Sequence, residues 1–170
     1  MRYHLLTLAA LMLAMTGMAQ NNRVYIEDFE IEPGSLITVP VLLANESPTR
    51  GFQFNLSLPQ GLTIVEYAAS DYLLKFDMNM TCADNAKDNC FTAFVYPSSN
   101  RCLPPDTTAV MTIQFKADTD FSGGEIKFWK TRGSTLDNQT IYMDDSMTTA
   151  SAAHGVPIDT QSDGNLFFNH

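Results

Sequence analysis

The chain has 170 residues, with 10 Lys and Arg residues against 19 Asp and Glu residues and a formal net charge of −9 at pH 7. This acidic balance excludes general binding to nucleic acid or anionic lipid, because phosphate recognition needs a basic stripe that the sequence lacks. The length is sufficient for one domain with a single continuous core.

Residues 1–19 carry the pattern of a secretory signal. A basic residue, Arg2, precedes an apolar run over residues 5–15, and the small residue Ala19 stands before the polar Gln20. This pattern predicts cleavage after about Ala19, and the apolar run is too short to span a bilayer as an anchor. We therefore expect a secreted protein, periplasmic or extracellular, that is not inserted in a membrane.

The rest of the chain is expected to form one domain over residues 20–153 and a C-terminal tail over residues 154–170. The domain contains short segments of alternating apolar and polar residues, separated by Gly, Pro, Asn and Asp. This pattern is typical of an antiparallel sandwich or barrel, so we expect an all-β fold. In chain order, the expected strands are residues 23–31, 36–46, 51–58, 62–68, 91–97, 109–117, 125–133 and 140–152.

Individual segments differ in how clearly they define the core. Residues 51–58 place four apolar side chains on one side and uncharged polar side chains on the other, where a solvated strand usually carries Lys, Glu and Thr. Residues 70–80 are ambiguous, because their apolar side chains also fit a helical turn. The most regular alternation predicts an inward face made of Ala109, Met111, Ile113, Phe115 and Ala117.

Three cysteines follow the predicted signal, at Cys82, Cys90 and Cys102. Because three cysteines cannot all pair within one chain, we favour a Cys82–Cys90 disulfide across a polar hairpin turn and leave the other pairings open. Closing so short a loop would stabilise the fold by about 2 to 3 kcal/mol.

No metal or cofactor site is expected. The cysteines lack the CxxC or Cys/His spacing of zinc sites. In the tail, Asp159 and Asp163 have the spacing of a calcium loop, but His170 stands where an acidic ligand is needed. We therefore expect a turn at this Asp-Gly segment.

The order of the segments resembles the cohesin-like family of secreted bacterial domains. The resemblance covers roughly Val24 to Thr149 and is carried by ITVPVLL, GFQFNLSLPQGLTIVEYA, FTAFVYPSS and AVMTIQFKADTDFSGGEIKF. It implies a nine-stranded jelly-roll β-sandwich that performs no catalysis.

In cohesins one flat sheet face binds the dockerin of a partner, and GFQFNLSL, FTAFVYP and EIKFWKT match strands of that face. The resemblance therefore suggests that the polar side chains of residues 51–58 are hydrogen-bonding groups for a partner. In residues 91–97 both faces are apolar, so the opposite orientation of that strand stays open. The candidate binding residues are Gln53, Asn55, Ser57, Phe94, Tyr96, Lys127 and Trp129.

An enzyme is not expected. The histidines are His4 in the predicted signal and His154 and His170 in the tail, and no GxSxG, HExxH, P-loop or GxGxxG motif occurs. We expect instead a protein that binds a dockerin-like or cell-surface protein.

Two alternatives remain at this stage. A carbohydrate-binding module would stack Tyr96 and Trp129 on the sugar rings of a polysaccharide. A structural or assembly subunit would self-associate through an unpaired strand after Leu136.

Overall fold

The computed structural model describes residues 22–85 and 90–153. The predicted signal over residues 1–19 and the tail over residues 154–170 lie outside the described residues, as do the predicted cleavage position and the calcium-like segment. Within the described part of the chain, no helix is long and apolar enough to cross a membrane.

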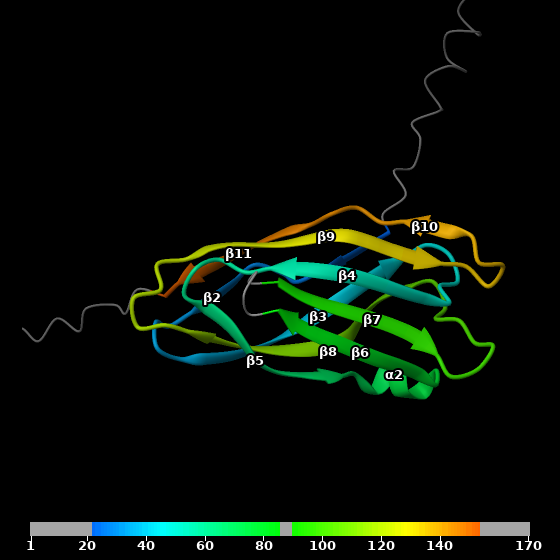
Figure 1. Cartoon of the computed structure of the whole chain (residues 1–170), viewed down its shortest axis with the longest axis horizontal. Coiled ribbons are helices and arrows are strands. Elements are labelled where there is room, and N and C mark those ends of the chain that lie inside the picture. Colours follow the sequence, from blue (N-terminus) through cyan, green and yellow to red (C-terminus); the bar gives the residue numbers. More distant parts are fainter. Residues whose placement is uncertain (1–21, 86–89, 154–170) are drawn as a thin grey trace, which may run out of the picture.

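The described chain contains eleven strands and one short helix, arranged in two layers (Figure 1). The elements are β1 (Arg23–Tyr25), β2 (Phe29–Ile31), β3 (Leu36–Asn45), β4 (Gly51–Ser57), β5 (Leu62–Ala69), α2 (Asp71–Lys75), β6 (Met78–Asn85), β7 (Cys90–Pro97), β8 (Asp106–Ala117), β9 (Gly124–Ser134), β10 (Thr140–Tyr142) and β11 (Met147–Ala152).

The strands form two sheets whose inner faces enclose one core. One sheet has the order β1-β3-β8-β5, and the other has the order β2-β11-β9-β4-β7-β6, with β10 paired to β9. Side chains of both sheets meet in a single cluster of buried residues. The predicted all-β sandwich is therefore confirmed.

The predicted count of nine strands is wrong, because two expected strands are each divided. Residues 23–31 become β1, which pairs with β3 in one sheet, and β2, which pairs with β11 in the other. Residues 140–152 become β10 and β11, which pair with opposite ends of β9. Residues 23–31 divide because their two halves pair in different sheets. β10 and β11 keep one register along β9, and their pairing is interrupted over residues 143–146, opposite the irregular part of β9 around Lys130.

A β-bulge between β3 and β8 changes which side chains enter the core. The register shifts between Val41, which faces Met111, and Leu42, which faces Ala109. Val110 is the extra residue and is fully buried, whereas Ala109 is only half-buried, contrary to its predicted inward position. The other inward positions of this strand are confirmed as buried: Met111, Ile113, Phe115 and Ala117.

The ambiguous residues 70–80 form the helix α2 and the start of β6. Ser70 caps the helix, because its Oγ accepts a hydrogen bond from the backbone N–H of Leu73. The side chain of Leu73 is fully buried. This short helix therefore closes the sandwich between β5 and β6, the last strands of the two sheets.

All three cysteines are free thiols, so the predicted Cys82–Cys90 disulfide is wrong. The strands β6 and β7 form the expected hairpin, but Asn85 faces Cys90, whereas Cys82 faces Ala93. Cys82 packs against the core. Cys90 points to the opposite face of the sheet, together with Thr92 two positions along β7, because strand side chains alternate. The two sulfur atoms therefore lie on different sides of the hairpin.

Alkylation of the unfolded chain with iodoacetamide, without reductant, should add three adducts. In the folded chain Cys82 should react most slowly, because burial raises its pKa to about 11 and keeps it as the neutral thiol at pH 8. Mass spectrometry of the intact protein and of the peptide that contains Cys82 measures both effects. A single adduct on the unfolded chain would contradict this prediction and indicate an intrachain disulfide.

Candidate recognition face

The outer surface of β9, β4, β7 and β6 brings together the residues that the sequence identified. These four strands lie side by side in that order (Figure 1). β4 is central, because it pairs antiparallel with β7 on one side and with β9 on the other. We call this surface the recognition face.

Cross-strand pairing arranges the outward side chains in rows that run from β9 to β6. Such neighbours lie close enough to act as one surface. One row contains Lys127, Ser57 and Cys90; the next contains Trp129, Asn55, Thr92 and Ala83; the next contains Arg132, Gln53, Phe94 and Thr81; beyond it, Ser134 faces Gly51, and Tyr96 faces Asn79.

The orientation of β7, which the sequence left open, is resolved by burial. Phe91, Ala93 and Val95 are at most 1% exposed and belong to the core. Phe94 and Tyr96 are 46% and 38% exposed on the outer face. Their ring centroids are 5.4 Å apart. The recognition face therefore presents a pair of neighbouring aromatic rings.

The polar side chains of β4 lie beside these rings. Gln53 is exposed, whereas Asn55 and Ser57 are half-buried. The hydroxyl of Thr92 donates a hydrogen bond to Oδ1 of Asn55 at 2.8 Å. This bond fixes the carboxamide of Asn55 and leaves its Nδ2 donors without a hydrogen-bond acceptor among the described residues.

A bulge in β9 places Trp129 and Lys130 together. Asn55 faces Trp129 and Gln53 faces Arg132, so β9 carries an extra residue between these pairs. Lys130 has a φ of 53°, a left-handed conformation that costs a residue with a side chain about 1 kcal/mol. Its Nζ lies 4.7 Å from the centroid of the Trp129 ring.

Two observations bear on the alternative functions. Trp129 is half-buried, and its indole nitrogen is covered and has no hydrogen-bond partner within the described residues. It therefore does not form, with Tyr96, a pair of freely exposed rings for a sugar. The segment after Leu136 is not an unpaired strand, because Thr140–Tyr142 pairs with the end of β9.

Lys127 is the remaining candidate residue and lies at the far end of β9. Its Nζ is 3.5 Å from a carboxylate oxygen of Glu125, and both side chains are more than half exposed. Such an exposed ion pair contributes little to stability. Lys127 therefore remains accessible to a partner.

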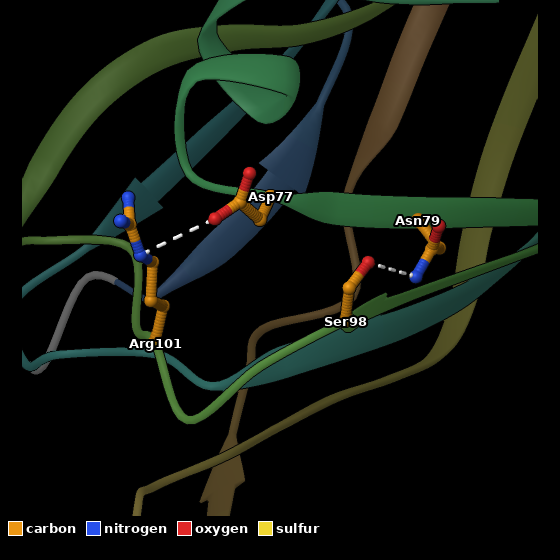
Figure 2. A network of polar contacts seen from close by, with 4 residues as sticks. All are labelled: Asp77, Asn79, Ser98 and Arg101. Atoms are coloured by element: carbon orange, nitrogen blue, oxygen red, sulfur yellow. Dashed lines mark hydrogen bonds and ion pairs between the residues drawn. The ribbon is translucent and has the colours of Figure 1, made fainter.

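Two exposed polar contacts lie at the edge of the recognition face. The guanidinium of Arg101 lies 3.3 Å from the carboxylate of Asp77, and Nδ2 of Asn79 donates to the hydroxyl of Ser98 at 2.6 Å (Figure 2). These contacts join the start of β6 to the chain that leaves β7. Since such exposed contacts contribute little to stability, the backbone pairing of β6 with β7 is what places Asn79 opposite Tyr96.

A pocket of about 480 Å³ lies at one end of the recognition face, where β4 begins and β7 ends. Gly51 is an outward position without a side chain, and a Cβ there would lie 2.7 Å from the carbonyl oxygen of Val95. Glycine thus permits the close approach of β4 to β7. We call this cavity the end pocket; among its lining residues are Arg50, Gln53, Phe94, Tyr96, Arg132 and Asn138.

Sequence reasoning missed Arg50 and Arg132 as site residues. Arg50 lies just before β4, and its Nη1 donates to Oδ1 of Asn138 at 3.0 Å. Arg132 lies in β9 after the bulge, where the simple alternation from Lys127 and Trp129 no longer holds. The sequence signal for a basic site was the presence of three Lys or Arg residues in 127–132. Because of the bulge, regular alternation does not predict which of them point outward.

The backbone of the chain matches solved cohesin structures, although neither a protein-family model nor a curated protein matches the sequence. A chain in a type I cohesin–dockerin complex from Clostridium thermocellum is 15% identical, with a TM-score of 0.65 over 78% of this chain and 99% of that chain. A non-cellulosomal cohesin from the archaeon Archaeoglobus fulgidus is 13% identical, with a TM-score of 0.62 over 78% of this chain and 92% of that chain.

A type II cohesin domain from the cellulosome of Acetivibrio cellulolyticus is also similar, with 13% identity and a TM-score of 0.59 over 75% of this chain and 94% of that chain. These likenesses extend over nearly the whole length of each cohesin. The protein is therefore a β-sandwich with a cohesin-like fold, as the sequence predicted.

The bulge in β9 gives a direct test of the site geometry. Lys130→Gly should be more stable than Lys130→Ala by about 1 kcal/mol, because only glycine adopts a positive φ without cost. Both variants remove the contact with Trp129, so the comparison isolates the backbone. Urea unfolding measures the difference. Greater stability of the alanine variant would instead indicate an ordinary strand position without a bulge.

Proposed function

We propose that the chain is an exported, non-catalytic binding domain that recognises a protein partner through the recognition face. The composition of this face carries the proposal, since two exposed aromatic rings lie beside uncharged polar side chains. Several of the matched cohesin structures are complexes with dockerins. These complexes support a dockerin-like protein as the partner.

The chemistry of the face suits a protein interface. Phe94 and Tyr96 supply apolar area, and aromatic side chains are enriched at interfaces, where Lys and Glu are depleted. Gln53 and Asn55 supply hydrogen bonds across the same surface. Because Thr92 already fixes the carboxamide of Asn55, less side-chain freedom is lost on binding.

Asn55→Arg should abolish partner binding while the fold is retained. The arginine places a long charged side chain at the centre of the face, and its cost to stability should stay near 1 kcal/mol, the value of the hydrogen bond to Thr92. The measurement is capture of proteins from the envelope and secretome of the producing cell, quantified by mass spectrometry, with thermal unfolding of each variant.

Thr38→Arg is the matched control, because Thr38 is exposed on β3 of the other sheet and also accepts a side-chain hydrogen bond, from Gln114. We expect one protein to be captured by wild type and Thr38→Arg, and to fall at least about tenfold with Asn55→Arg and with Tyr96→Ala. Equal capture by all four proteins would overturn the proposal. The proposal would also be overturned if both variants still captured the protein and if the chain bound a polysaccharide that only Tyr96→Ala failed to bind.

A further inference from the structure

We propose that the end pocket binds an acidic side chain of the partner, next to an apolar side chain that packs on Phe94 and Tyr96. The partner segment is thus expected to be acidic where it crosses the start of β4. This inference rests on the proposed function and adds the chemistry of the partner to it.

Charge on the recognition face is opposite to the charge of the chain. The protein carries a net charge of −9 with only 10 Lys and Arg residues, yet Arg50, Lys127, Lys130 and Arg132 lie on or beside this face. The cross-strand rows described above contain no Asp or Glu, and the one carboxylate beside them on β9, Glu125, pairs with Lys127. A partner segment that is acidic would therefore be attracted to this surface and repelled by the rest of the protein.

The end pocket concentrates two of these cations. Within the described chain, the guanidinium of Arg132 makes no ion pair or side-chain hydrogen bond. Arg50 uses Nη1 to reach Asn138 and keeps its other N–H donors. A guanidinium matches the planar geometry of a carboxylate and forms two parallel hydrogen bonds with it.

In the described chain, neither Asp137 nor Glu125 forms an ion pair with these arginines. Asp137 precedes Asn138 in the turn before β10, but it is not among the residues that line the pocket and forms no ion pair in the described chain. Glu125 pairs with Lys127 at the other end of β9. The positive charge in the end pocket is thus left for a ligand.

The opposite wall of the end pocket is apolar. Phe94 and Tyr96 both line it, and their rings are in contact with each other. Gly51 pairs with Ser134 and lies against β7, where a Cβ would meet the carbonyl oxygen of Val95 and the Cα of Tyr96. A volume of about 480 Å³ falls in the range of small-ligand sites. The pocket can therefore accept a carboxylate and a neighbouring apolar group together.

The test uses three acetylated and amidated peptides, Gly-Phe-Glu-Gly, Gly-Phe-Gln-Gly and Gly-Phe-Lys-Gly, titrated into the ¹⁵N-labelled full chain. We expect the Glu peptide to shift the amide signals of Gly51, Tyr96 and Gly133, with an affinity about tenfold higher than the Gln peptide. Equal affinities for the Glu and Lys peptides, or shifts confined to other residues, would overturn the inference.

A variant pair separates the role of charge from a change in structure. Arg132→Gln should lower the affinity for the Glu peptide about tenfold and leave the affinity for the Gln peptide unchanged. Lys116→Gln, at an exposed position of β8 in the other sheet, should change neither affinity. Equal loss for both peptides with Arg132→Gln would overturn the inference.

Failure of this inference can be told apart from failure of the proposed function. If partner capture depends on Asn55 but not on Arg132, the proposed function of the recognition face stands and the proposal of an acidic ligand in the end pocket is rejected. Capture that depends on neither residue would reject both.

Discussion

The position of β4 between β9 and β7 is the constraint on which the rest of the site depends. Its inward side chains Phe52, Phe54 and Leu56 are buried, and the ring of Phe54 packs 5.3 Å from the ring of Phe128 on β9. Because side chains in a strand alternate, this burial forces the intervening residues outward. A slip of one residue would exchange the core with the recognition face, so the hydrophobic core also fixes which side chains form that face.

Irregular backbone at two places then gives this flat surface its particular shape. The bulge at Lys130 turns the basic end of β9 outward beside Trp129, and Gly51 allows β4 to approach β7 closely where the end pocket lies. Bulges and glycines in strands are commonly used to redirect side chains or to allow close approach of other groups. The regular part of the face supplies area and hydrogen bonds, whereas its irregular end supplies charge.

The sequence predicted the part of this arrangement that depends on local alternation. The outward positions of β4 and the cohesin-like sandwich could be read from period-two patterns and segment order. Pairing between distant segments could not be read in this way. Arg50 and Arg132 line the same pocket because of the register between β4 and β9. Cys82 and Cys90 separate because the β6–β7 pairing continues into the residues that were expected to form the turn. The division of residues 23–31 between two sheets depends equally on distant partners.

Site-specific photo-crosslinking tests most directly whether the outer surface of β9, β4, β7 and β6 is where the partner binds. A photoreactive amino acid replaces Phe94 on this surface or, as a control, Thr38 on the other sheet, and the cells that produce the protein are irradiated. Binding through the recognition face predicts a covalent adduct to one protein from position 94 and none from position 38. An adduct from position 38 alone, or no adduct from position 94, would contradict it.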